Sequence, residues 1–250
     1  MIHRDGRDGV LVLRMAHGKA NAFDTEVVAD LERALDDAAD ARAIVLTGTG
    51  TIFSAGVDLF RVVQGGREYI ERFLPALGSL FVRVFEHPAP IVAAVNGHAI
   101  AGGCVLACAC DRRVAARGSG RIGLPELIVG VPLPTSALEI VRFAARGAVL
   151  SELIYRGRTA EPDEACGLGL VDEVVEPAAL LDRARDAALE LAAIPAATFR
   201  LTKRALRQPA LDRIRQEPSS SERDLINVWA APDTLEAVRR YLERTLKRPV

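Results

Sequence analysis

Apolar residues gather in short runs along the first two thirds of the chain, and four of these runs are rich in residues that favour strands. They cover residues 10–13, 43–47, 91–95 and 113–116, and most positions within them are apolar. Such a strand is covered on both faces, because an alternating strand would instead turn every second side chain to water. The four runs therefore predict a buried sheet.

Apolar residues at helical spacing separate these runs. Asp24 is suited to cap the first helix. The apolar stripe of that helix consists of Val27, Leu31 and Leu35, and a second stripe consists of Phe73, Leu77, Leu80 and Val84. Pro75 falls inside the second stripe and is expected to break or kink it. The alternation of strands and helices predicts an α/β core of the βαβ type over residues 1–175.

From Pro177 onward the strand-like runs stop and helical stripes remain. The stripes comprise Leu180, Ala184, Ala187 and Leu191, then a segment from Pro195 onward, and finally Leu235, Val238, Leu242 and Leu246. The polar segment 217–221 is expected to be a linker. Residues 176–250 are thus predicted to form a helical region, which could pack on the core, cover a site or close an oligomer interface.

Composition favours a small-molecule ligand. The 250 residues are 50% hydrophobic, enough for one extended domain or for a core with a smaller appendage. The net charge of -1 gives no field that would attract nucleic acid or an anionic membrane. No apolar run approaches the roughly 20 residues that span a bilayer, and residues 1–6 lack the apolar part of a secretory signal. We expect a cytoplasmic protein.

The cysteines and histidines do not indicate a metal site. Cys104, Cys108 and Cys110 lie in one alanine-rich stretch, and Cys166 stands alone. This distribution is typical of buried, reduced thiols rather than of disulfides or paired zinc ligands. The four histidines are scattered along the chain. No metal is expected.

One glycine motif can be set aside. Residues 118–123 match G-x-G-x-x-G, the fingerprint of dinucleotide-binding folds. The last glycine should open a helix, but Leu124 and Pro125 follow it. The motif is therefore not expected to bind a dinucleotide.

Two other glycine segments lie where a strand passes into a helix. Residues 55–58 read Ala-Gly-Val-Asp, in which Asp58 is suited to cap the next helix, and residues 101–103 read Ala-Gly-Gly. The first N–H groups of a helix have no partner within it, so each segment can direct a free N–H at a substrate oxygen. Tight packing of helix on sheet would also demand glycine. With the carboxylate of Glu126, the segments form a candidate site for charge that develops on a carbonyl oxygen.

Several motifs occur in an order that is specific for one family. They are Gly18-Lys19-Ala20-Asn21-Ala22, Leu46-Thr47-Gly48 with Ser54-Ala55-Gly56-Val57-Asp58-Leu59, Val95-Asn96-Gly97 with Gly102-Gly103-Cys104, Asp111, and Leu124-Pro125-Glu126 with Gly130-Val131-Pro132. This set resembles the enoyl-CoA hydratase/isomerase (crotonase) superfamily along nearly the whole chain. The resemblance implies an α/β fold with a crotonase-like ββα core and a helical C-terminal trimerisation region, in a homotrimer or a dimer of trimers.

The resemblance also implies roles for particular residues. A CoA thioester would bind with its carbonyl oxygen between the N–H groups of Val57 and Gly102, and Glu126 would be the catalytic acid and base. The residues implied to line the path of CoA and the acyl group are Lys19, Ala20, Ala22, Ala55, Asp58, Leu59 and Val105. Coenzyme A is then part of the substrate, and no separate cofactor is expected.

The chain departs from the family pattern at one catalytic position. Hydratases of the family use two glutamates, but Val105 occupies the first of these positions and only Glu126 remains. Valine can neither accept a proton nor orient water. A single carboxylate suffices for the 1,3-proton shift between 3-enoyl-CoA and 2-enoyl-CoA, so isomerisation is favoured. The alternatives are a hydratase or another crotonase-type reaction in which an unidentified residue replaces the missing glutamate, and a catalytically silent subunit that binds CoA esters.

Overall fold

A six-stranded sheet forms the centre of the computed structural model, which describes residues 1–145, 147 and 149–246. Its strands, in spatial order, are β1 (Ile2–Arg7), β2 (Val10–Met15), β3 (Ala43–Thr47), β5 (Ile91–Val95), β7 (Arg112–Ala116) and β10 (Glu173–Val175). The pairing of β1 with β2 is antiparallel, and the other pairs are parallel. The four predicted runs become β2, β3, β5 and β7, as the buried pattern predicted.

A second, smaller sheet was not predicted. It consists of β4 (Ile52–Ser54), β6 (His98–Ile100), β8 (Ile122–Gly123) and β9 (Thr159–Ala160). Strands of two or three residues are too short for a recognisable hydrophobic period. This sheet matters for function because the chain leaves β4 and β6 directly into the two glycine segments.

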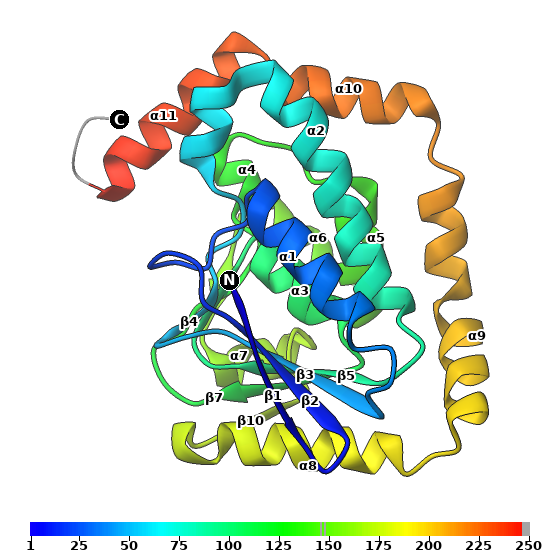
Figure 1. Ribbon diagram of the computed structural model, residues 1–250. Coiled ribbons are helices and arrows are strands. Elements are labelled where there is room, and N and C mark those ends of the chain that lie inside the picture. Colours follow the sequence, from blue (N-terminus) through cyan, green and yellow to red (C-terminus); the bar gives the residue numbers. More distant parts are fainter. Residues whose placement is uncertain (146, 148, 247–250) are drawn as a thin grey trace.

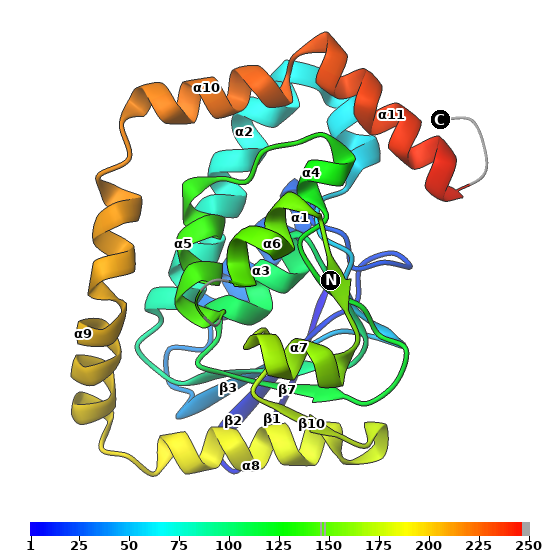
Figure 2. The ribbon, with the colours of Figure 1, turned by 180° about the vertical axis from the view of Figure 1, so that it is seen from behind.

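Helices cover both faces of the large sheet (Figure 1; Figure 2). One face carries α1 (Thr25–Asp36), α2 (Leu59–Glu86), α3 (Gly102–Ala109) and α5 (Thr135–Ala144), and the shorter helices are α4 (Glu126–Val129), α6 (Val149–Tyr155) and α7 (Pro162–Leu168). The opposite face is covered by α8 (Leu180–Ala192), which packs against β3, β5 and β7. Alternate residues of β2, β3, β5 and β7 therefore face two different apolar clusters.

The predicted caps of two helices are present. A carboxylate oxygen of Asp24 accepts a hydrogen bond of 2.8 Å from the N–H of Val27 at the start of α1. Asp58 accepts hydrogen bonds from the N–H groups of Phe60 and Arg61 at the start of α2. Each cap satisfies donors that have no partner inside the helix.

The expected break at Pro75 is wrong. Helix α2 continues through Pro75, and the non-helical residue within it is Gly66, with φ 54° and ψ -146°. Proline costs about 3 kcal/mol in a helix interior, whereas burying one large apolar side chain contributes about 1.5–3 kcal/mol. The buried neighbours Phe73, Leu74 and Leu77 therefore outweigh the proline. Glycine adopts positive φ without steric cost, which places the kink at Gly66.

The C-terminal region continues with a 3₁₀ turn (Pro177–Ala179) before α8, and with α9 (Ala196–Arg215), α10 (Ser219–Trp229) and α11 (Pro232–Leu246) after it. The expected linker 217–221 is too long, because α10 already begins at Ser219. Pro218 is extended, with ψ 141°, and directs the chain into the new helix. The stripe of α11 packs on the body of the same chain, where Val238 and Leu242 are buried. The side chain of Leu246 lies outside the described part.

A buried ion cluster anchors α9 to the sheet. Asp111, immediately before β7, accepts hydrogen bonds from Lys203 Nζ (2.8 Å) and from the N–H of Ile91 (2.8 Å), and it pairs with Arg207 at 2.9 Å. Burial lowers the pKa of Lys203 to about 8, although Asp111 opposes this effect. The cluster holds the C-terminal region against the core.

Among the described helices, none is long and apolar enough to cross a membrane.

Asp111→Asn is expected to lower the free energy of unfolding by about 3–5 kcal/mol, because it leaves two buried cations without their carboxylate. Urea denaturation followed by circular dichroism measures this loss. Asp37→Asn is the matched control, since Asp37 pairs with Arg4 at the surface with both side chains largely exposed, and should cost less than about 1 kcal/mol. Equal losses in the two variants would contradict the anchoring role.

Candidate active site

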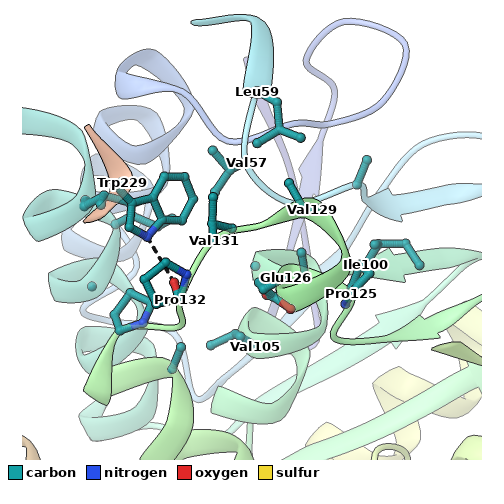
Figure 3. Close-up of a pocket in the computed structure, with 18 of the residues that line it drawn as sticks. Val57, Leu59, Ile100, Val105, Pro125, Glu126, Val129, Val131, Pro132 and Trp229 are labelled. Carbon is teal, nitrogen blue, oxygen red and sulfur yellow. Dashed lines mark hydrogen bonds between the residues drawn. The ribbon is translucent and has the colours of Figure 1, made fainter. Parts of the chain in front are cut away.

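A mainly apolar cavity lies between α2, α3, α4 and the C-terminal helices (Figure 3). Six of the ten predicted site residues line it: Ala55, Val57, Leu59, Gly102, Val105 and Glu126. They come from the segment after β4, from the start of α2, from α3 and from α4. The fold thus brings both glycine segments and the carboxylate to one cavity.

The N–H of Val57 is directed away from the strand pairing beside it. Val57 forms an isolated parallel bridge with Phe23. The residues on either side of Val57 make the hydrogen bonds of this bridge. The N–H of Phe23 donates to the carbonyl of Gly56, and the N–H of Asp58 donates to the carbonyl of Phe23. Within the described residues, the N–H of Val57 donates no hydrogen bond. It remains available to a ligand.

The N–H of Gly102 is available for a different reason. Gly102 is the first residue of α3, so its N–H has no partner within the helix. No other acceptor within the described part of the chain bonds to it. The preceding residue, Ala101, has φ 52°, a conformation that costs energy for any residue with a side chain. Such strain is typical of functional sites.

The two glycine segments lie in close contact. A Cβ atom on Gly56 would lie 3.1 Å from the nitrogen of Gly102, and one on Gly103 would lie only 2.3 Å from the carbonyl oxygen of Ser54. Gly56 and Gly103 are therefore needed for packing, which is the alternative explanation considered from the sequence. The same packing places the segment of Val57 next to the free N–H of Gly102. Packing and binding are compatible at this site.

Glu126 supplies the carboxylate. It begins α4, only 9% of it is exposed, and its Oε2 atom has no hydrogen-bond partner within the described residues. Burial raises the pKa of Glu126 to about 7, although a hydrogen bond from its own N–H opposes the shift. An acid with such a pKa can accept and return a proton near neutral pH.

The surroundings of Glu126 are apolar. Val105 lies one turn along α3 from Gly102 and is buried in the wall of the cavity (Figure 3). Among the described residues that line the cavity, Glu126 is the only carboxylate. The site therefore has one proton-transfer group of this type and a hydrophobic surface beside it.

The other four predicted residues lie outside the cavity lining. The segment of Lys19, Ala20 and Ala22 runs beside it, and the carbonyl of Ala20 accepts a hydrogen bond of 3.0 Å from the N–H of Ala55. Lys19 is exposed, the two alanines are half-buried, and Asp58 caps α2. These residues border the segment that carries Val57, so they lie beside the candidate site without facing its interior.

Sequence reasoning missed two aromatic residues that the C-terminal helices bring to the site. Trp229 of α10 and Tyr241 of α11 line the cavity, and the indole N–H of Trp229 donates to the carbonyl of Pro132 at 3.0 Å (Figure 3). The stripes indicated that the C-terminal helices have an apolar face, and covering a site was one possibility. The residues that reach the cavity depend on how the helices dock, which no local pattern specifies.

Comparison with known proteins identifies the class. The chain matches the family model described as enoyl-CoA hydratase/isomerase over residues 5–248, so it belongs to the enoyl-CoA hydratase/isomerase family. A putative enoyl-CoA hydratase of Thermus thermophilus is 38% identical over 239 residues, which cover 92% of each protein. The mitochondrial enoyl-CoA delta isomerase 1 of Rattus norvegicus is 26% identical over 250 residues, 98% of this chain and 86% of that protein.

The fold also agrees with solved structures. The human mitochondrial delta3-delta2-enoyl-CoA isomerase superposes with a TM-score of 0.94, covers 98% of both chains and is 24% identical. An enoyl-CoA isomerase of Mycobacterium tuberculosis, with 31% identity, has a TM-score of 0.81 over 92% of this chain and 98% of that chain. The predicted crotonase fold class is therefore confirmed.

Glu126→Gln is expected to stabilise the protein at pH 8 but not at pH 4. The folded-state pKa of about 7 lies above the ordinary value of 4.5, so burial penalises the ionised form as the pH rises between these values. Above pH 7 the penalty is complete, on the order of 3 kcal/mol, and glutamine avoids it.

Urea denaturation at the two pH values measures this difference. Glu68→Gln is the matched control, because the Glu68 side chain is 85% exposed. Its replacement should leave the free energy of unfolding within about 0.5 kcal/mol of the parent's at both pH values. If Glu126→Gln had the same effect at pH 4 and pH 8, the raised pKa would be wrong.

Proposed function

We propose that the protein catalyses the 1,3-proton shift that converts a 3-enoyl-CoA into the conjugated 2-enoyl-CoA. The observation that carries this proposal is that, among the described residues, one buried carboxylate lines an apolar cavity beside two backbone N–H groups that donate no hydrogen bond. Belonging to the enoyl-CoA hydratase/isomerase family supports an acyl-CoA substrate. Coenzyme A enters as part of that substrate.

In the proposed reaction, the N–H groups of Val57 and Gly102 bind the thioester oxygen. The Glu126 carboxylate removes the proton at C2, and the electron pair moves to the thioester oxygen as a dienolate forms. The two fixed donors stabilise this charge, each by on the order of 3 kcal/mol. The protonated Glu126 then returns the proton to C4, and the double bond now lies between C2 and C3. The Glu126 carboxylate is thereby ionised again, as it was before the reaction.

The apolar wall supports isomerisation over hydration. Adding water to a 2-enoyl-CoA needs a group that orients the water and one that moves its proton. Val105 offers neither, and it excludes water that would compete for the dienolate. Hydration is the second candidate, because relatives such as the Thermus thermophilus protein are named putative hydratases.

Gly102→Pro tests the oxyanion site. Proline removes the N–H but is tolerated at the first position of a helix, so turnover should fall at least about 10²-fold while the protein stays folded. Gly102→Ala is the control, since it keeps the donor and adds only a methyl group 3.2 Å from the ring of Phe23. A folded proline variant with the parent rate would refute the assignment.

The choice between isomerase and hydratase is tested by initial rates on matched 3-enoyl-CoA and 2-enoyl-CoA esters, followed by the absorbance of the conjugated thioester. The parent should isomerise much faster than it hydrates.

Glu126→Gln should cut isomerisation at least about 10²-fold, the lower range of general acid–base catalysis. Val105→Glu should raise hydration above the parent's rate, provided the buried carboxylate is tolerated.

Fast hydration by the parent, without isomerisation, would rule out the isomerase. It would also show that a group other than residue 105 handles the water. Tight binding of both esters without turnover would instead identify a catalytically silent subunit.

A further inference from the structure

A groove lined by basic residues runs along α9, on the side of the molecule away from the candidate active site (Figure 1; Figure 2). It lies between α9 and the end of α2 and has a volume of about 270 Å³. Among the described residues, none lines both this groove and the cavity beside Glu126. The charged residues that line the groove are Glu86, Arg200, Lys203, Arg204, Arg207 and Arg215.

One face of α9 is basic over two turns. Arg200, Lys203, Arg204 and Arg207 are spaced i, i+3, i+4 and i+7, which places them on the same side of the helix. Residues 191–211 contain no Asp or Glu, so no acidic residue of the helix lies among them. The whole chain has a net charge of -1, and the positive charge of this face is therefore a local feature.

The innermost side chains of the groove carry an excess of buried positive charge. The side chains of Lys203 and Arg207 are only 6% and 5% exposed, and both pair with the carboxylate of Asp111. Arg207 also donates to three backbone carbonyls. Within the described residues, the three donors of the Lys203 ammonium have one acceptor, Asp111. One carboxylate does not neutralise two cations, and buried charge without compensation is costly.

Two arginines at the edge of the groove lack a partner. Arg200 and Arg204 are exposed, and in the described part of the chain neither forms an ion pair or a side-chain hydrogen bond. Arg215, farther along α9, pairs with Glu86. With Asp111 included, the groove has five cations and two carboxylates. A basic face that served only solubility would not need two of its cations buried around one carboxylate.

We propose that the groove along α9 binds the phosphate group of a small molecule. The guanidinium groups of Arg200 and Arg204 match the geometry of phosphate oxygens, and the Lys203 ammonium supplies a further donor from below. The groove is much larger than the roughly 30 Å³ that one water occupies in the liquid, so a phosphate with an organic group attached fits. The proposed isomerisation does not use this groove, and either can hold without the other.

The test is a calorimetric titration of the protein with inorganic pyrophosphate. The ionic strength is kept at about 0.15 M, at which exposed charges more than about 8 Å apart are largely screened. Cellular substrates lie at about 1 μM–1 mM, so the parent should bind one pyrophosphate per chain with a Kd of about 1 mM or below. Adenosine diphosphate carries the same two phosphates on an organic group. Its affinity relative to pyrophosphate shows whether the site takes a free or an esterified phosphate.

The double variant Arg200→Gln with Arg204→Gln should weaken pyrophosphate binding at least about tenfold, because it removes two charge-assisted hydrogen-bond donors. Both arginines are exposed, so the variant should fold. Arg72→Gln with Arg156→Gln is the matched control. It removes the same charge from side chains that are 69% and 76% exposed elsewhere, and should leave the affinity unchanged. Lys19→Gln should also leave it unchanged.

Three results would overturn the phosphate site and leave the proposed function standing. The first is a parent that shows no saturable binding of pyrophosphate. The second is equal affinity in the parent and in the double variant at Arg200 and Arg204. The third is an equal loss in the control variant, which would show a general attraction of anions. Binding that depends on Lys19 instead would place pyrophosphate beside the candidate active site and would also overturn the groove.

Discussion

The candidate site depends on the contact between the segment after β4 and the start of α3. The Cβ positions at Gly56 and Gly103 would lie against backbone atoms, so side chains cannot separate the two segments. The small sheet holds this contact in place, because β4 and β6 pair in parallel and each leads into one of the segments. The position of the two free N–H groups is thus set by backbone pairing. Donors fixed in this way need no reorganisation when charge develops on a ligand, which makes them effective.

Glu126 shows a conflict between stability and reactivity. An exposed carboxylate would be ionised well below neutral pH and would be a weaker base. Burial raises its pKa to about 7, Oε2 has no hydrogen-bond partner in the described part of the chain, and the folded state is penalised whenever the group ionises. The apolar wall, including Val105, therefore has two effects. It raises the pKa of Glu126, and in the proposed isomerisation it would keep water away from the dienolate.

The C-terminal helices have separate tasks, although their apolar stripes look alike in the sequence. Helix α8 covers the face of the large sheet that the other helices leave open. Helix α9 is held by the buried carboxylate of Asp111. Helices α10 and α11 lie at the end of the molecule opposite α8, and they complete the cavity with Trp229 and Tyr241 (Figure 2). The walls around Glu126 thus come from residues between Ala55 and Tyr241, which belong to both the core and the C-terminal region.

The sequence by itself determined the central strands, the caps at Asp24 and Asp58, the glycine segments and the family, because these are encoded in contiguous residues or in the order of motifs. The catalytic roles of Val57, Gly102 and Glu126 stay predictions, although the fold brings these residues to one cavity. Tertiary structure alone decided that α2 continues through Pro75 and leaves helical geometry at Gly66, which aromatic residues reach the cavity, and that Lys19 lies outside its lining. It also decided the pKa of Glu126. Each of these outcomes depends on the energy of contacts between residues far apart in the chain, which local patterns do not contain.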